Sequence, residues 1–176
     1  LETAIDQTVE AYGDLSRDKV GALMVFERQD LLDDEVKTGT ALDCGVSSEL
    51  LKNIFWNKAP LHDGAVIVRK GRIVGAGCML PLSGNVNLSR DLGMRHRAGI
   101  GMSEHSDAVV VIVSEETGSI SAAVGGMLKR HLAPETLERL LRNELLNDKQ
   151  EEKRSGQLPL VGLLLGGSKK EEGDPL

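Results

Sequence analysis

The segment DAVVVIVS, residues 107–114, contains six consecutive apolar residues, from Ala108 to Val113. A short, continuous apolar run that is rich in β-branched residues is typical of a strand buried inside a sheet. GALMVF, residues 21–26, is a second run of this kind. Because buried strands must be covered by other layers, these two runs constrain the fold more than any other feature of the chain.

The segments around these strands alternate between helical and extended patterns. Apolar residues at helical spacing predict a first helix through Ile5, Val9, Tyr12 and Leu15, and a last helix that Pro134 opens and that carries Leu137, Leu140, Leu141 and Leu145. The other expected elements are a helix capped by Ser47 or Ser48, a hairpin of residues 64–68 and 72–80, a helix over residues 94–106 and a strand over residues 120–124. Residues 27–45 lack sustained periodicity and predict a surface excursion. This interleaving predicts an α/β fold with a mixed sheet.

Length and charge exclude several classes of function. A chain of 176 residues is long enough to form one domain without disulfides, and Cys44 and Cys78 match no metal or redox spacing, so both are expected in the core of a protein from a reducing compartment. A net charge of −6 and very few aromatic side chains argue against nucleic acid as a partner. A phosphate ligand would therefore need a local cluster of cations.

The sequence offers three polar clusters for chemistry. Arg95, His96 and Arg97 form a cationic triplet among small residues at a loop-to-helix junction. Guanidinium groups at such a junction bind polyphosphates well, although a solvated helix start is the more common interpretation of such a triplet alone. Asp63 and Gly64 stand directly before a predicted strand, where they fit either a turn or a ligand site that needs close backbone approach.

The third cluster, Ser114, Glu115 and Glu116, follows the apolar run of residues 107–114. Strand ends are where ligands gather in α/β sheets, although adjacent acids before a turn are also ordinary. Together the three clusters hold carboxylates for a divalent cation, guanidinium groups for phosphates and glycines for access. This inventory fits phosphoryl or nucleotidyl transfer, while no P-loop or kinase glycine loop is present.

Several segments resemble a known family in order and spacing: VSSELLKNIF, PLHDGAVIV, MLPLS and LGMRHRAGIGMSEHSDAVVVIVSEETGSIS. They are similar to the diadenylate cyclase domain, also called the DAC or DisA_N domain, and most closely to its membrane-associated CdaA type. The resemblance runs from about Ile5 to Leu146, and its most specific part is the Asp-Gly-Ala motif at Asp63 followed by the Arg-His-Arg motif at Arg95.

The resemblance implies a mixed, twisted central sheet surrounded by helices. It implies condensation of two ATP into cyclic di-AMP with release of two pyrophosphates, dependent on Mn²⁺, Mg²⁺ or Co²⁺. Each protomer would hold one ATP, and two protomers would meet face to face in a homodimer, so a monomer would bind ATP without making product.

Site residues are carried over from the family by matching motifs. The resemblance implies that Asp63, Arg95, His96 and Arg97 are catalytic, with Asp63 activating or orienting the attacking hydroxyl and the triplet binding and neutralising the triphosphate. It implies ATP contacts from Gly64, Ala65, Met79, Leu80, Met94, Arg95, Ser114 and Glu115, with Met79 and Leu80 flanking the adenine. It further implies His62, Asp63 and Glu116 as metal ligands.

Two positions depart from the family pattern. Many relatives have Thr at the position of Met94, and a thioether cannot donate the hydrogen bond of that hydroxyl. Relatives often have Tyr at the position of Met79, where a softer sulfur contact would replace stacking. Neither change removes a charged group, so we expect altered ATP affinity rather than inactivity.

The charge pattern of the C-terminal segment and the resemblance together predict the wider setting of the chain. Residues 1–147 are expected to form the catalytic domain and residues 148–176 a charged, flexible tail. CdaA-type relatives have N-terminal helices that anchor them to the bacterial membrane, with the catalytic domain in the cytoplasm, and their regulators include a YbbR-repeat protein and phosphoglucosamine mutase. The alternatives to a cyclase are a non-catalytic nucleotide-binding sensor and a phosphohydrolase that uses the same metal site.

Overall fold

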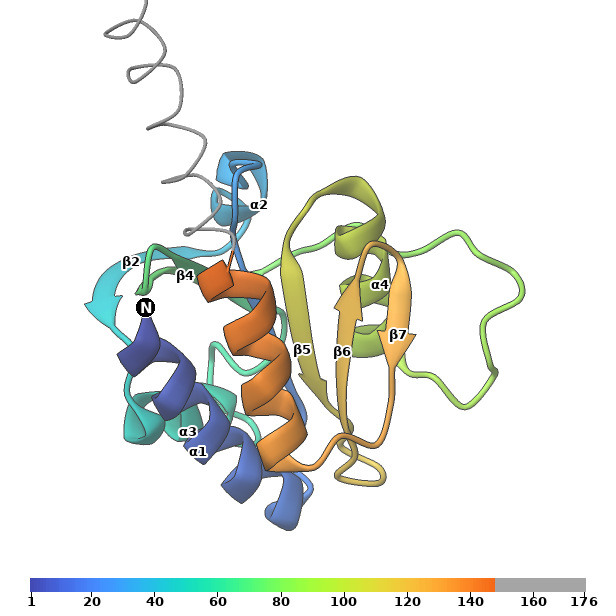
Figure 1. The fold of residues 1–176 in the computed structure, drawn as a ribbon, viewed down its shortest axis with the longest axis horizontal. Helices are drawn as coiled ribbons and strands as arrows, with labels where there is room; N and C mark the ends of the chain where they lie inside the picture. The colour runs from blue at the N-terminus through green and yellow to red at the C-terminus, as the bar shows by residue number, and fades with distance from the viewer. Residues whose placement is uncertain (148–176) are drawn as a thin grey trace, which may run out of the picture.

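The computed structural model describes residues 1–147, which form a 7-stranded sheet with helices on both faces (Figure 1). In chain order the elements are α1 (Glu2–Asp18), β1 (Ala22–Phe26), α2 (Asp33–Val36), β2 (Thr40–Gly45), α3 (Ser48–Phe55), β3 (Ala65–Arg69), β4 (Arg72–Cys78), α4 (Met94–His105), β5 (Val109–Val113), β6 (Ile120–Val124) and β7 (Met127–Lys129). A further helix covers residues 134–147.

The strand order is β2-β4-β3-β1-β5-β6-β7. β1 pairs with β3 in parallel, whereas every other neighbouring pair is antiparallel. The sheet is therefore mixed, which confirms the fold class expected from the sequence. Strands β1 and β5 lie at its centre and are buried along their whole length, as their continuous apolar runs predict.

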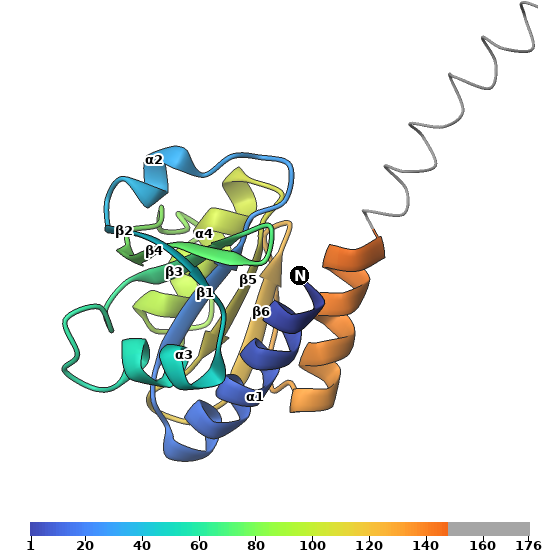
Figure 2. The same cartoon turned by 90° about the vertical axis from the view of Figure 1, so that its left-hand side faces the viewer.

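Side chains on alternating positions of the central strands form two cores, one on each face of the sheet. Met24, Val66 and Val111 pack with α1, α3 and the helix of residues 134–147 on one face. Val25, Ile67 and Ile112 pack with α4 on the other. Figure 2 shows this layering, with α1 and the last helix on one side of the sheet and α4 on the opposite side.

Local chemistry explains where several elements begin and end. The Ser47 side chain accepts a hydrogen bond from the Leu50 backbone N–H at 3.2 Å, so Ser47 is the N-cap of α3. Lys70 and Gly71 both have positive φ, 50° and 79°, and this is the geometry of a two-residue type I′ turn between β3 and β4. The expected hairpin is therefore confirmed.

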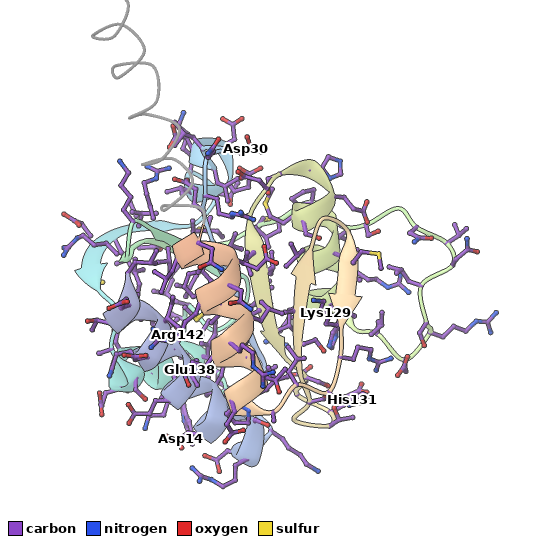
Figure 3. The ribbon with its side chains drawn as sticks, in the orientation of Figure 1. Asp14, Asp30, Lys129, His131, Glu138 and Arg142 are labelled. Carbon is purple, nitrogen blue, oxygen red and sulfur yellow. The ribbon has the colours of Figure 1, made fainter. Side chains whose placement is uncertain are left out.

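Ion pairs on the surface join the first and last helices. Arg142 contacts Asp6 at 2.6 Å and Glu138 at 3.2 Å, and Figure 3 shows Arg142 and Glu138 on the last helix. Leu137 and Leu141 of this helix are fully buried against the sheet, which confirms the helix predicted to start at Pro134. In the described part of the chain, no helix is long and apolar enough to cross a bilayer.

Two strands were not expected from the sequence. Residues 27–45 were predicted to form a surface excursion, but they contain α2 and the edge strand β2, which pairs with β4. β7 is likewise an edge strand. Both edges are largely exposed, so they lack the apolar signal of a buried strand. The tail predicted for residues 148–176 lies outside the described residues.

Candidate functional site

The predicted site residues gather along one edge of the sheet. At this edge β1 and β3 begin while β4 and β5 end, because Ala65 pairs with Cys78 and Ala22 pairs with Val113. The three polar clusters of the sequence lie before β3, after β5 and at the start of α4. The fold therefore brings together segments that are up to about fifty residues apart in the sequence.

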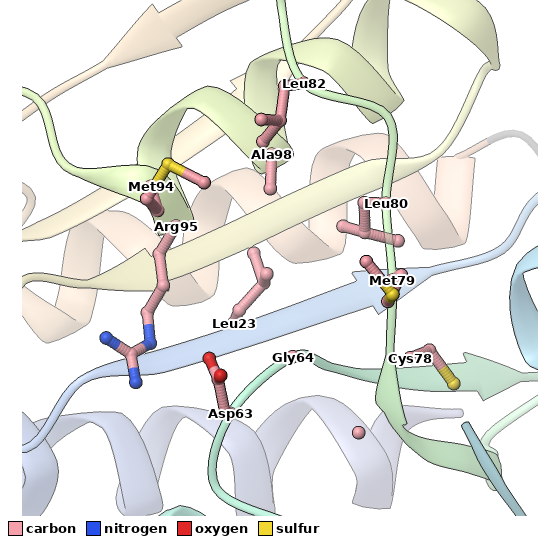
Figure 4. A pocket seen from close by; sticks show the side chains of 11 residues that line it. Leu23, Asp63, Gly64, Cys78, Met79, Leu80, Leu82, Met94, Arg95 and Ala98 are labelled. Carbon is pink, nitrogen blue, oxygen red and sulfur yellow. The ribbon is translucent and has the colours of Figure 1, made fainter. Parts of the chain in front are cut away.

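The first cavity at this edge, of about 330 Å³, is called the methionine cavity here. Its lining consists of Leu23, Asp63, Gly64, Gly77, Cys78, Met79, Leu80, Leu82, Met94, Arg95 and Ala98. Figure 4 shows Arg95 and Asp63 at one end of it, with Met79 and Leu80 at the other. The cavity therefore has a charged end and an apolar end, which is the chemistry that a nucleotide presents.

The second cavity, of about 560 Å³, is called the mixed-charge cavity. Its lining consists of Asp18, Lys19, Val20, Gly21, Phe55, Trp56, Asn57, His62, Arg95, Glu115 and Glu116. It holds cations, carboxylates and an imidazole close together, which suits a metal-bound polyphosphate.

Arg95 lines both cavities. Its side chain is only 18% exposed, and its nearest acidic partner is Glu115, with Nη1 and Oε2 3.5 Å apart. This distance is too long for a strong hydrogen bond. The buried Nε atom has no hydrogen-bond partner among the described residues. A desolvated guanidinium with unused donors is a suitable binding group for a phosphate.

Gly64 shapes the loop that carries Asp63. Its φ is +94°, and a Cβ at this position would lie 2.7 Å from the Gly77 carbonyl carbon and 2.8 Å from the Cys78 oxygen. Glycine is therefore required for the close approach of β4, in addition to any contact with a ligand. Asp63 itself is exposed and lines the methionine cavity.

His62 lines the mixed-charge cavity, although it is adjacent in sequence to Asp63. Its Nδ1 lies 2.7 Å from the Ala59 carbonyl oxygen. Because a carbonyl only accepts, Nδ1 donates in this contact and Nε2 carries the free lone pair. A backbone contact of this kind fixes the tautomer and orientation of histidines that bind metals.

The predicted metal ligands His62, Asp63 and Glu116 are not gathered into one cluster. Within residues 1–147, no group of three or more His, Cys, Asp and Glu side chains is placed to hold a metal ion. The donors present, an oriented imidazole and exposed carboxylates, still fit Mn²⁺ or Mg²⁺. Such ions often take one or two protein ligands and complete their shell with substrate phosphates and water.

His96 and Arg97 do not line either cavity. His96 is buried, and burial, assisted by the nearby charge of Arg130, lowers its pKa below the usual 6.5. The imidazole is therefore neutral at pH 7, so the triplet holds two cations rather than three. The backbone carbonyl of Arg97 accepts a hydrogen bond from the Ser83 N–H at 3.0 Å, which fixes the segment that follows β4.

Ser114 and Ala65 also lie outside the two cavity linings. The Ser114 hydroxyl accepts hydrogen bonds from the backbone N–H groups of Glu116 and Thr117, both at 3.3 Å, and so shapes the turn after β5. Ala65 is fully buried in the core on the α4 side. Of the expected ATP contacts, Gly64, Met79, Leu80, Met94, Arg95 and Glu115 do line a cavity.

Sequence reasoning missed several lining residues, among them Leu23, Gly77 and Leu82 of the methionine cavity and Lys19, Gly21 and Trp56 of the mixed-charge cavity. Most carry no charge, so nothing in their local pattern marks them. Lys19 ends α1 in the left-handed conformation, with φ 53°, a conformation that a sequence does not reveal for lysine.

A family model described as "DisA bacterial checkpoint controller nucleotide-binding" matches residues 9–128. The chain is 45% identical over 148 residues to the cyclic di-AMP synthase CdaA of Bacillus subtilis, and the aligned region covers 82% of this chain and 54% of that protein. It is 45% identical over 132 residues to the diadenylate cyclase of Listeria monocytogenes, and the aligned region covers 75% of this chain and 48% of that protein. The chain thus spans about half the length of these curated relatives.

Two solved structures are also similar to this chain in fold and sequence. A double mutant of DacA from Staphylococcus aureus superposes with a TM-score of 0.79 at 44% identity, covering 81% of this chain and 95% of that one. A structure described as a hypothetical membrane spanning protein from Bacillus cereus superposes with a TM-score of 0.70 at 44% identity, covering 73% of this chain and 63% of that one.

The α/β fold and the charged cavities at its sheet edge define a nucleotide-binding domain. The chain belongs to the diadenylate cyclase domain family. This membership confirms the resemblance found in the sequence motifs around Asp63 and Arg95.

Proposed function

We propose that this chain is the catalytic domain of a diadenylate cyclase, within residues 1–147, and that it condenses two ATP into cyclic di-AMP and two pyrophosphates. The observation that carries the proposal is the methionine cavity, where Asp63 and Arg95 share one end and Met79 and Leu80 form the other, in a chain 45% identical to a cyclic di-AMP synthase. The cavity matches the two chemically different parts of ATP.

The proposed binding mode follows from the two linings. Met79 and Leu80 hold the adenine by apolar contact, and Gly64 gives room beside the ribose. Arg95, which faces both cavities, binds the phosphates as they pass from the methionine cavity to the mixed-charge cavity. His96 and Arg97 support the start of α4, which positions Arg95.

The proposed reaction is an in-line displacement that occurs twice. The ribose 3′-oxygen of one ATP attacks the α-phosphorus of the other, and the bond from that phosphorus to the bridging oxygen breaks. Pyrophosphate leaves with the bond electrons, and Asp63 accepts the hydroxyl proton. Arg95 neutralises the charge that develops on the phosphates. Repeating the step with the roles exchanged closes the ring.

A divalent ion, Mn²⁺, Mg²⁺ or Co²⁺, would supply charge neutralisation at the phosphates and lower the pKa of the attacking hydroxyl. His62 and Glu116 are the residues of the mixed-charge cavity that would hold it, with Asp63 next to His62 in the chain. This proposal is supported by the donor chemistry of these side chains and by the family membership.

The single experiment that tests the function is incubation of the purified chain with ATP and Mn²⁺, followed by mass analysis of the nucleotides. Cyclic di-AMP is the expected product. ADP or AMP would instead identify a phosphohydrolase, and unchanged ATP with measurable binding would identify a nucleotide sensor.

The family membership also supports proposals about the surroundings of the domain. We propose that it acts as a face-to-face homodimer and that the full protein is held at the bacterial membrane, with its catalytic domain in the cytoplasm. A YbbR-repeat protein and phosphoglucosamine mutase are proposed regulators on the same basis. Co-purification with the tagged full-length protein from membranes tests these partners.

A further inference from the structure

Gly21 lies directly before β1 and lines the mixed-charge cavity. A Cβ added to it would lie 2.7 Å from Cζ and from Nη1 of Arg95, and 3.1 Å from Nε. These are its three nearest heavy atoms outside its own neighbours in the chain. The guanidinium therefore rests against the backbone of Gly21, at a distance at which a Cβ would force the Arg95 side chain to shift.

The backbone conformation of Gly21 does not itself require glycine, because its φ lies outside the left-handed region. Gly64 and Gly101 differ from Gly21 in what a Cβ would meet. A Cβ at Gly64 would meet the backbone of β4, and a Cβ at Gly101 would lie 1.9 Å from the Pro81 carbonyl oxygen. Those glycines are needed for the fold, whereas the contact at Gly21 falls on the end of one flexible side chain.

We propose that Gly21 is a positioning residue for Arg95. The absence of a side chain at Gly21 lets the guanidinium lie flat against the start of β1, at the boundary between the methionine cavity and the mixed-charge cavity. From there its donors reach a phosphate chain that runs through both cavities. The identity of that phosphate chain as part of ATP rests on the proposed function, while the position of Arg95 does not.

The geometry explains why a small displacement matters. With alanine at position 21, the guanidinium would have to withdraw by several tenths of an ångström to reach an ordinary contact of 3.4 Å. Its donors would then turn away from the phosphates. Loss of one charge-assisted hydrogen bond to a phosphate weakens binding by about ten- to a hundredfold. The acidic partner of Arg95 among the described residues is Glu115, at the long distance of 3.5 Å, so no close ion pair opposes this withdrawal.

Gly21→Ala is the test variant, and Gly45→Ala is its matched control because a Cβ at Gly45 would meet no atom within 4 Å. Melting temperature and ATP affinity by calorimetry are measured for both, with Mg²⁺ present. Gly21→Ala is expected to melt at the parent's temperature and to bind ATP about ten- to a hundredfold more weakly. The control is expected to match the parent in both measurements. Parent-like ATP binding by Gly21→Ala, or a large loss of melting temperature, would overturn the inference.

The decisive comparison is a double-mutant cycle with Arg95→Ala. If Gly21 acts through Arg95, adding Gly21→Ala to Arg95→Ala causes no further loss of ATP affinity, because no guanidinium remains to be displaced. Independent, additive losses would overturn the inference. A parent chain that binds ATP but forms no cyclic di-AMP would refute the proposed function and leave this cycle interpretable.

Discussion

Arg95 and Asp63 are the two charged residues of the methionine cavity, and they have different surroundings. Arg95 is mostly buried and lacks a close partner, whereas Asp63 is exposed on a loop that Gly64 shapes. The cation is therefore desolvated before a ligand arrives. The carboxylate, in contrast, stays hydrated until a nucleotide covers it.

Removing either charge is expected to reduce cyclic di-AMP formation. Arg95→Ala deletes charge-assisted hydrogen bonds of about 1.5–3 kcal/mol each, which corresponds to about ten- to a hundredfold in rate if they act in the transition state. Asp63→Asn is expected to cost more, because it removes the proton acceptor as well as the charge. The rate losses of both variants are measured as initial rates of cyclic di-AMP formation at saturating ATP and Mn²⁺.

Arg72→Ala is the control for this pair, since Arg72 lies on an exposed part of β4 and pairs with Asp43 rather than with site residues. It is expected to keep the parent's rate. Near-parent turnover in Asp63→Asn at saturating Mn²⁺ would show that the role assigned to Asp63 is wrong.

The buried His96 makes stability depend on pH. Burial, assisted by Arg130 and Arg95, lowers its pKa in the folded state below 6.5, although Asp91 and Glu116 act in the opposite direction. The unfolded chain then binds more protons than the folded one at mildly acidic pH. This contribution to stability is complete above about pH 6.5 and is lost as the pH falls through the lowered pKa.

We therefore expect the free energy of unfolding to decrease from pH 7 to pH 5, and His96→Gln to show a smaller decrease. Urea denaturation at several pH values gives the slope of the free energy of unfolding against pH for the parent and for His96→Gln. Equal slopes in the two proteins would rule out His96 as the source.

The elements of this fold differ in how far the sequence predicted them. Burial on both faces leaves a continuous apolar run, which predicted the strands of residues 22–26 and 109–113. A two-residue turn leaves its own local pattern, which predicted the β3-β4 hairpin. β2 and β7 were missed because an exposed edge strand needs few apolar residues. The alternation of Leu42 and Cys44, which pack on the core, is the signal that marks β2.

The candidate site was predicted in composition but not in arrangement. Adjacent charges such as His62 and Asp63 were expected to act together, yet they line different cavities. Gly21 could not be predicted at all, since its importance comes from Arg95, which lies far away in the sequence. Contacts between distant segments depend on the whole sheet and leave no local pattern.

An ion pair with a buried carboxylate joins the residue after β1 to the last residue of β3, at the end of the sheet opposite to the site. Glu27, whose side chain is 2% exposed, accepts hydrogen bonds from Arg69 Nε at 2.7 Å and Nη2 at 2.8 Å, and from the Leu32 N–H at 2.9 Å. Arg69 also contacts the exposed Asp33 at 2.6 Å, so loss of Glu27 removes the buried one of the two carboxylates that compensate its charge.

Glu27→Gln is expected to lower the free energy of unfolding by about 2 kcal/mol, as measured by denaturant titration. Asp43→Asn is the matched control, because Asp43 pairs with Arg72 on an exposed surface and is expected to leave stability unchanged. A Glu27→Gln protein as stable as the control would contradict this interpretation of the ion pair.

At the scale of the whole molecule, the methionine cavity is open. Met79 and Met94 on its rim are 71% and 65% exposed, so the apolar rim of the cavity faces solvent. A site of this kind excludes water only when something covers it, and in the proposed reaction the cover is the ATP-loaded face of a second protomer.

Product formation is therefore expected to depend on protein concentration more steeply than ATP binding does. Specific activity should rise with concentration below the dissociation constant of the dimer, while the ATP bound per chain stays constant. Rate measurements over about a hundredfold dilution series check this. A constant specific activity across that series would argue against catalysis between protomers.

The burial of β1 and β5 has a consequence for hydrogen exchange. Both strands are covered on both faces and paired on both sides, so their amides should exchange only by global unfolding. Gly21 directly precedes β1, and Ser114 directly follows β5. Protection should thus fall steeply within a residue or two at this edge. A bound nucleotide would slow amide exchange in the flanking loops. Exchange in those loops would still be faster than in the central strands.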